Sequence, residues 1–343
     1  TDAFGCINDD FVIINQYNSP VVNAGNEYGG PDRYKFGKND GAYTISQESD
    51  VPSGSGFAKS YKIDVTSAAS STGTQYVFLR QMIEGQDLQH LKKGTSSAES
   101  LTLQFWVKST KIGTYVVQLY DIDTSSNRQI CKTYTVNSSN TWEYKTITFA
   151  GDTTGAFDSD NAASLEINWW LYAGSTYTSG TLQTSWGAYS NANTAVGQVN
   201  AADSTSNNIF FTGIQLEVGK NATDFEHRSY GEELARCQRY YYEYPKGNTY
   251  NIIANGLANT STNALFHFQY PVPMRSAPVI AASGNWQVID GQSHSVSGFS
   301  AITDATELTG RVDATSSGLT AGRACMLRNN NDATATFSFN AEL

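Results

Sequence analysis

Few residues in this chain could carry out a hydrolytic reaction. Each of its four histidines could supply the base of a Ser/His/Asp triad, but none accompanies a Gly-x-Ser-x-Gly elbow or another nucleophile context. His267 alternates with two phenylalanines, which is typical of a sheet residue. His227 lies between a glutamate and an arginine, and we expect it to hold its segment by hydrogen bonds. The sequence therefore predicts no triad, neither at these two nor at His90 and His294.

Carboxyl groups are more numerous but poorly placed for glycoside hydrolysis. That reaction needs two carboxyl groups about 5 to 10 Å apart across a sugar. The chain has 32 aspartates and glutamates, most of them in polar loops such as 158–160. A depolymerase would usually be longer and would carry a repetitive β-helix, and no such repeat is visible. We expect a protein that is not an enzyme, without catalytic residues or cofactors.

One segment, 121–125, begins like a calcium-binding loop. It places oxygen ligands at alternate positions, starting with Asp121 and Asp123. The sixth position is Ser126 where such a loop needs glycine, and the twelfth is Lys132 where it needs a bidentate glutamate. A turn at the end of a strand fits this pattern better. We predict no metal site.

Aromatic and amide side chains alternate with apolar residues along several predicted strands. Such a face can bind sugars, because rings stack on pyranoses while amides hydrogen-bond the hydroxyl groups. It can equally be covered by a neighbouring subunit or by the long loop 174–206, and large aromatic patches usually mark protein interfaces. We expect one face to present Gln104, Trp106, Gln118, Tyr120, Asn168, Trp170, Tyr172 and Gln215.

Short alternating strands account for the first two thirds of the chain. Charged residues make up only 16% and aromatics reach 12%, a balance that favours many strands joined by polar turns. The spacing predicts an all-β fold whose residues 1–228 form a two-sheet jelly-roll sandwich. We expect strands at 61–65, 76–82, 101–108, 114–120, 130–136, 142–149, 165–172 and 209–218.

A single helical pattern separates this region from a second one. Leu234 and Cys237 recur at helical spacing after Ser229 and two acidic residues. We expect a short helix at 229–241, within a linking segment 229–244. Residues 245–343 are predicted to form a smaller β-sandwich, with strands at 264–270, 278–282 and 334–341.

Charge and cysteine content exclude several classes of function. The net charge is −10, so nucleic-acid binding by phosphate neutralisation is not expected. No apolar run approaches the ~20 residues that cross a bilayer, and the first residues show no signal-peptide pattern. The four cysteines form no C-x-x-C pair, and buried free thiols fit a protein made in a reducing cytoplasm.

A long segment resembles a signature of bacteriophage tail-fibre and virion structural proteins. It comprises Phe211 to Gly219 and Ala222 to Tyr241. The segments 103–109, 142–152, 273–278, 318–322 and 339–343 resemble the same family, so the resemblance covers nearly the whole chain. The N-terminal part also resembles the jelly rolls of carbohydrate-binding modules in its pattern.

The resemblance implies a virion component made in the host cytoplasm. It implies a homotrimer with other virion proteins as partners, without nucleic acid or membrane insertion. Three functions compete: a tail-fibre subunit that attaches to a host surface, a head-decoration or cement protein, and a carbohydrate-binding accessory module. For a host glycan, the acidic charge and the few basic residues near the aromatic face predict a neutral or weakly charged ligand.

Overall fold

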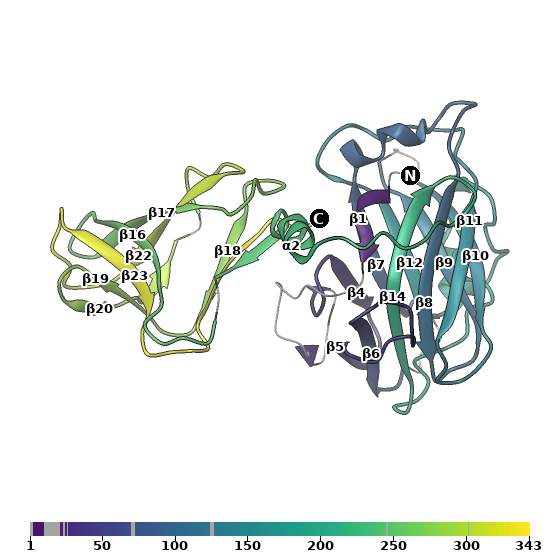
Figure 1. Ribbon diagram of the computed structural model, residues 1–343, viewed down its shortest axis with the longest axis horizontal. Coiled ribbons are helices and arrows are strands. Elements are labelled where there is room, and N and C mark those ends of the chain that lie inside the picture. The colour runs from purple at the N-terminus through teal and green to yellow at the C-terminus, as the bar shows by residue number, and fades with distance from the viewer. Residues whose placement is uncertain are drawn as a thin grey trace. The chain divides into compact units, whose positions relative to one another are not determined.

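The computed structural model describes residues 3–9, 21–22, 25, 27–69, 73–123, 127–244, 246–300 and 302–343. Their contacts divide the chain into an N-terminal unit, Thr1–Tyr230 with Leu343, and a C-terminal unit, Gly231–Glu342. Residues 231–244, predicted as a separate linker, fall within the C-terminal unit. The described chain is nearly all β (Figure 1), which confirms the predicted fold class.

Two antiparallel sheets form the N-terminal unit. Sheet A has the order β11-β8-β14-β6-β5-β2, with β1 also paired to β14. Its strands are β1 (Ala3–Asp9), β2 (Val21–Val22), β5 (Ala42–Glu48), β6 (Ser60–Ser67), β8 (Leu101–Ser109), β11 (Glu143–Phe149) and β14 (Asn208–Val218). Sheet B has the order β13-β10-β9-β12-β7-β4-β3. Its strands are β3 (Glu27–Tyr28), β4 (Tyr34–Lys38), β7 (Tyr76–Glu84), β9 (Gly113–Asp121), β10 (Arg128–Val136), β12 (Ala163–Ala173) and β13 (Gly187–Ala188).

Alternating apolar residues of the two sheets meet in one core. Phe105 of β8 and Phe211 of β14 come from sheet A, and Trp169 of β12 comes from sheet B. Their ring centroids are 6.1 to 6.3 Å apart. All three side chains are fully buried, and each such burial contributes roughly 1.5–3 kcal/mol. This shared core fixes which residues face outward on each sheet.

All eight strands predicted for this region are present, at β6 to β12 and β14. The structure adds strands β1 to β5 and β13, which were not predicted. The segment between β12 and β14 is not a plain loop. It contains α1 (Ser175–Thr178), β13 and the 3₁₀ turn η3 (Asn191–Asn193), and two further 3₁₀ turns, η1 (Gly85–Asp87) and η2 (Gln89–Leu91), follow β7.

The C-terminal unit is the smaller sandwich that the sequence predicts. Sheet C has the order β15-β24-β18, and sheet D the order β20-β19-β23-β16-β17-β22-β21. The strands of sheet C are β15 (Tyr241–Glu243), β18 (Val279–Ser283) and β24 (Thr336–Asn340). Those of sheet D are β16 (Ile252–Ala258), β17 (Asn263–Gln269), β19 (Trp286–Ile289), β20 (Ser293–Ser295), β21 (Gly298–Phe299), β22 (Thr309–Thr315) and β23 (Ala324–Asn329). Phe268 of sheet D stacks on Phe337 of sheet C, with centroids 5.1 Å apart.

The observed helix is shorter than the predicted one. Helix α2 runs from Tyr230 to Gln238, whereas the sequence predicts a helix that continues to Tyr241. Tyr240 is instead fully buried, and Tyr241 starts β15. Consecutive tyrosines favour extended backbone once it can pair with a neighbouring strand, and β24 supplies that pairing.

Three cysteines lie within the described chain, all buried as free thiols: Cys131, Cys237 and Cys325. Burial raises the pKa of Cys131 to about 12 and that of Cys325 to about 11. These thiols are therefore protonated at neutral pH. Cys6 belongs to a strand whose side chains lie outside the description. No helix in the described parts of the chain is long and apolar enough to cross a membrane.

Candidate functional site

Four of the predicted residues gather on the outer face of sheet B. Gln118 and Tyr120 project from β9, and Asn168 and Trp170 project from the adjacent β12. Gln118 and Asn168 are direct cross-strand partners. Because side chains of a strand alternate between its two faces, Trp169 enters the core while its neighbours point outward. The strand pattern predicted the shared outward direction of these four side chains.

Strands β7 and β4 extend the same rows with residues that were not predicted as site residues. Arg80 of β7 pairs with Asn168, and Lys35 of β4 pairs with Arg80. One residue row therefore runs Lys35, Arg80, Asn168, Gln118 across four strands. A second row runs from Gly37 through Phe78 to Trp170.

The sequence held a usable signal for β7 but little for β4. Tyr76, Phe78 and Arg80 alternate with Val77 and Leu79 in a strand that was correctly predicted. Their side chains could have been assigned to the outer face on that ground. Strand β4 was not predicted, so the sequence could not indicate which of its side chains lie on the outer face.

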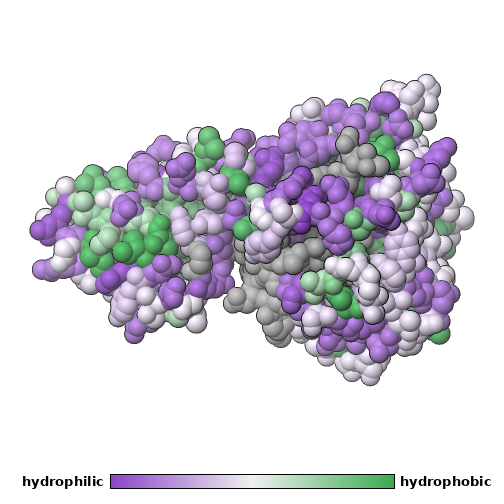
Figure 2. Space-filling model, viewed as in Figure 1, coloured by the Kyte–Doolittle hydropathy of each residue, from purple (hydrophilic) through white to green (hydrophobic). Residues whose placement is uncertain are grey.

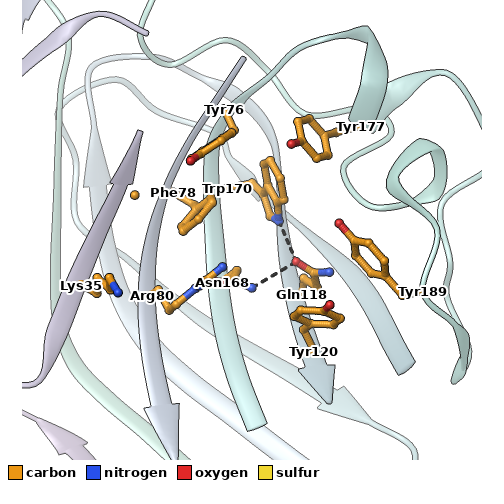
Figure 3. A pocket seen from close by; sticks show the side chains of 11 residues that line it. Lys35, Tyr76, Phe78, Arg80, Gln118, Tyr120, Asn168, Trp170, Tyr177 and Tyr189 are labelled. Atoms are coloured by element: carbon orange, nitrogen blue, oxygen red, sulfur yellow. Dashed lines mark hydrogen bonds between the residues drawn. The ribbon is translucent and has the colours of Figure 1, made fainter. Parts of the chain in front are cut away.

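The segment after β12 closes one side of this face. Tyr177 of α1 and Tyr189, which follows β13, both line a pocket of about 410 Å³ over sheet B. Figure 3 shows their rings beside Trp170 and Tyr120. The predicted alternative that loop 174–206 covers the aromatic face is thus realised in part, because the loop forms a wall and leaves a pocket open. The other lining residues are Lys35, Gly37, Tyr76, Phe78, Arg80, Gln118, Tyr120, Asn168 and Trp170.

Glycine at position 37 keeps the pocket open beside Phe78. A Cβ atom placed on Gly37 would lie 2.2 Å from the Phe78 ring, far inside van der Waals contact. Any larger residue would push this ring out of its position. The Phe78 ring stacks on Tyr76 with centroids 5.2 Å apart, and the Arg80 guanidinium carbon lies 4.6 Å from the Phe78 ring centroid.

The amides of the pocket floor are bonded within the protein. Gln118 Oε1 accepts hydrogen bonds from Asn168 Nδ2 at 3.1 Å and from Trp170 Nε1 at 3.2 Å (Figure 3). Gln118 Nε2 donates to Gln129 Oε1 at 2.7 Å, which also accepts from Thr194 of the loop. We expected these amides to bind sugar hydroxyls. They serve instead to fix the Trp170 indole and to tie the loop to the sheet.

Arg80 links this floor to a buried carboxylate. Its Nε donates to Asn168 Oδ1 at 2.7 Å, and its Nη1 lies 2.9 Å from Glu166 Oε1. Burial raises the pKa of Glu166, although the Arg80 charge acts in the opposite direction. The ion pair neutralises one positive charge, so Lys35 adds a net positive charge to this end of the pocket.

The hydroxyls of Tyr76 and Tyr177 are the groups best placed to meet a ligand, whereas the Tyr189 hydroxyl donates to Asn191 Oδ1. No described residue forms a hydrogen bond with the hydroxyl of Tyr76 or Tyr177, and both side chains are half-buried. Tyr120 instead accepts a hydrogen bond from Asn127 at 2.6 Å. Burial raises the pKa of Tyr189 to about 12, so this hydroxyl is protonated at neutral pH.

The remaining predicted residues do not reach this pocket. Gln104 and Trp106 belong to β8 in sheet A, on the opposite outer face of the sandwich. Trp106 lies beside Tyr144 with centroids 5.4 Å apart, and the Tyr144 hydroxyl donates to Gln104. The predicted single face was wrong because alternation within a strand does not tell which sheet the strand joins.

Tyr172 is displaced into the core by a bulge. The register of β12 against β7 shifts between Trp170 and Tyr172, so that Tyr172 pairs with Val77. Two consecutive residues, Leu171 and Tyr172, then enter the hydrophobic core. A bulge of this kind reverses the alternation that the prediction assumed.

Gln215 holds the segment that follows β14. Its Oε1 accepts a hydrogen bond from the backbone of Glu226 at 2.9 Å, and its Nε2 donates to the carbonyl of Asp224. Phe225 and His227 pack with Phe57 on this face. In Figure 1 the segment runs across the strands of sheet A towards α2. The signature segment therefore covers part of sheet A.

The candidate calcium loop instead belongs to a buried ion cluster. Asp121 Oδ1 accepts the backbone N–H of Asp123, as in a strand-end turn, while residues 124–126 lie outside the described chain. Lys93 Nζ lies 2.8 Å from Asp121 and 3.3 Å from Asp152, which Arg128 also binds. Two cations thus face two carboxylates. No group of three metal ligands occurs in the described parts of the chain.

No family model and no curated protein matches the chain. Solved structures match weakly. One is the enzymatically active domain of bacteriophage CBA120 tailspike protein 4, at 13% identity and TM-score 0.32, covering 54% of this chain and 19% of that one. A CBM4 structure matches at 14% identity and TM-score 0.30, covering 60% and 97%.

A third match is the family 11 carbohydrate-binding module of Clostridium thermocellum in complex with a β-1,3-1,4-mixed-linked tetrasaccharide. It has 13% identity and TM-score 0.29 and covers 55% of this chain and 91% of that one. The chain spans about a fifth of the tailspike chain that it matches. Similarities at these TM-scores do not identify a ligand.

Proposed function

We propose that this chain binds an oligosaccharide in the pocket on sheet B, as a subunit of a bacteriophage appendage that contacts the host surface. The pocket itself is the observation that carries this proposal. Its volume of about 410 Å³ fits one or two sugar rings. It combines half-buried aromatic rings with a fixed polar floor.

Aromatic surface would supply most of the contact. The Tyr76 and Phe78 rings are stacked, with 15° between their planes. The ring centroids of Trp170 and Tyr177 lie 5.1 Å apart. Pyranose rings carry apolar C–H faces that pack on such rings. The hydroxyls of Tyr76 and Tyr177 can then donate to and accept from sugar hydroxyls.

The charges at one end of the pocket bear on the charge of the expected ligand. The sequence suggested few basic residues near the aromatic face, and hence a neutral or weakly charged glycan. The structure brings Lys35 and Arg80 to the pocket from β4 and β7, and of these two, Arg80 alone forms an ion pair among the described residues, with Glu166. A sugar bearing one acidic group at the Lys35 end would therefore be accepted as well as a neutral one.

The chemistry of the lining supports binding without turnover. None of the eleven described residues that line the pocket is an aspartate or a glutamate. The nearest carboxylate, Glu166, is buried and pairs with Arg80. Glycoside hydrolysis needs two carboxyl groups facing the sugar, so the protein is proposed to act by binding alone.

The appendage role rests on the sequence signature at 211–241. Part of this signature, Asp224 to His227, packs on the outer face of sheet A, away from the pocket. The signature residues are thus used within the fold, which leaves the sheet B pocket free for a ligand.

Two experiments test the proposal. Electron cryomicroscopy of the particle should place the chain on the tail, and a location on the head would reject the appendage role. Binding of the purified full chain to immobilised lipopolysaccharide and capsular polysaccharide from host bacteria tests the ligand. We expect retention that soluble polysaccharide of the same kind displaces. A chain that binds none of these glycans would contradict the proposed function.

A further inference from the structure

Strand β18 leaves one side of sheet C unpaired. The sheet order is β15-β24-β18, so β18 pairs only with β24 among the described strands. Alternate residues of an antiparallel edge strand direct their N–H and C=O groups away from the partner strand. Such an edge is a template for another strand, and proteins usually protect it.

Charged residues are missing from this edge. Strand β11, at the edge of sheet A, carries the ion pair Lys145–Glu143 with 2.6 Å between the charged atoms. Charges of this kind discourage strand addition. Residues Val279 to Ser283 of β18 include no charged residue. Val279 is 70% exposed, and Ala281 to Ser283 are exposed as well.

A second pocket opens beneath the edge. It measures about 400 Å³ and lies between β18 and residues 296–300, with Trp286 and Phe299 among its lining. Ile280 packs partly on the core, whereas Ala282 is small and leaves this space open. A strand added to β18 would cover the opening and could place an apolar side chain in it.

The charge distribution indicates what covers this surface. From Ser276 to Thr303 the only charged residue is Asp290, which is 3% exposed and lies 2.9 Å from His294. The whole chain has a net charge of −10, so two copies repel each other over most of their surfaces. A neutral apolar strip is where two such copies can meet without bringing like charges together.

The C-terminal unit is also the more apolar of the two at its surface. In the described chain, five of the eight exposed large hydrophobic residues belong to it. Figure 2 shows hydrophobic residues gathered on this unit in the view given. These five are Tyr250, Ile252, Leu257, Val279 and Leu308.

We propose that the β18 edge and the pocket beneath it form a surface through which copies of this chain associate. A strand of a second copy pairs with Val279 to Ser283 and places an apolar side chain against Trp286 and Phe299. This inference is independent of the glycan pocket, which lies in the N-terminal unit.

Sedimentation equilibrium of the full chain tests this directly. Wild type is expected to show a mass above that of the monomer at micromolar concentration. Ala281→Lys should weaken association at least about tenfold, because a charged side chain on a sheet edge, lysine above all, opposes the addition of another strand. Ala281 is exposed, so the variant should fold, and circular dichroism checks this. Ala281→Ser, which adds no charge, should associate as wild type does.

Leu257→Lys provides the matched comparison. Leu257 is 45% exposed on sheet D, so the substitution adds the same charge to another apolar site of the same unit. It should leave association unchanged. A monomeric wild type would overturn the proposal. So would an Ala281→Lys variant that associates normally, or a loss of association caused by Leu257→Lys alone.

Discussion

The indole nitrogen of Trp170 lies 3.2 Å from Gln118 Oε1 and donates a hydrogen bond to it. The same oxygen accepts from Asn168. Trp170 is 3% exposed and Gln118 is 2% exposed, so neither group has water as a ready substitute. The orientation of the aromatic floor thus depends on one amide.

Gln118→Leu keeps the shape of this side chain but removes the acceptor. The buried N–H of Trp170 then loses its partner, and Asn168 Nδ2 keeps only its longer hydrogen bond to Glu166 at 3.4 Å, which together cost about 1–3 kcal/mol of unfolding free energy. Denaturant unfolding followed by tryptophan fluorescence measures this change. Thr146→Val is the control, because Thr146 is exposed on β11, and it should change stability little. Equal stability of the two variants would show that the network does not hold the floor.

The ion cluster around Lys93 predicts a contrast between neighbouring lysines. The Lys93 side chain is 4% exposed and faces Asp121, which is fully buried. Lys93→Met leaves that carboxylate without its closest cation, and we expect a loss of about 3–5 kcal/mol in unfolding free energy. Lys92→Met removes an exposed pair with Glu99 instead, and a much smaller change is expected. Similar losses for both variants would argue against a special role of the buried cluster.

Asp290 predicts how the C-terminal unit responds to acid. The backbone N–H of Thr320 donates to its Oδ2 at 2.7 Å and, together with His294, lowers the pKa of Asp290 to about 2. The unfolded value is about 3.9. Because the folded pKa is depressed, this stabilisation is complete above about pH 4 and is lost as the pH falls towards 2.

Hydrogen exchange of β23 peptides between pH 2 and 5 follows this unit specifically. In wild type, the protection of β23 amides against exchange should decrease as the pH is lowered. In Asp290→Asn, protection should depend less on pH. Asp304→Asn, at a mostly exposed carboxylate of the same unit, should behave as wild type. A steep dependence that persists in Asp290→Asn would show that another group is responsible.

The sequence predicted the elements of this protein better than their assembly. Alternation located β8, β9 and β12 and the outward direction of Trp106, Tyr120 and Trp170. It could not assign these strands to opposite sheets, because sheet order depends on contacts distant in sequence. It also missed the bulge that buries Tyr172, since one extra residue in a strand leaves no pattern of its own.

Other parts of the site had no local signal at all. Tyr177 and Tyr189 lie in a long irregular segment, and the hydrogen bond from Thr194 to Gln129 that ties this segment to the sheet joins residues 65 apart in sequence. Lys35 reaches the pocket through a strand that was not predicted. Arg80 could have been found, because it follows Tyr76 and Phe78 at alternate positions of a predicted strand.

Binding of host polysaccharide by paired double variants decides whether the sheet B pocket is the ligand site. Tyr76→Ala with Tyr177→Ala removes rings and hydroxyls from the pocket wall and leaves the buried floor intact. Trp106→Ala with Tyr144→Ala removes a comparable aromatic pair from sheet A. With both proteins shown to be folded, we predict that the first loses binding at least about tenfold, which is ~1.4 kcal/mol, and that the second binds as wild type. Retained binding in the first, or lost binding in the second, would contradict a ligand site on sheet B.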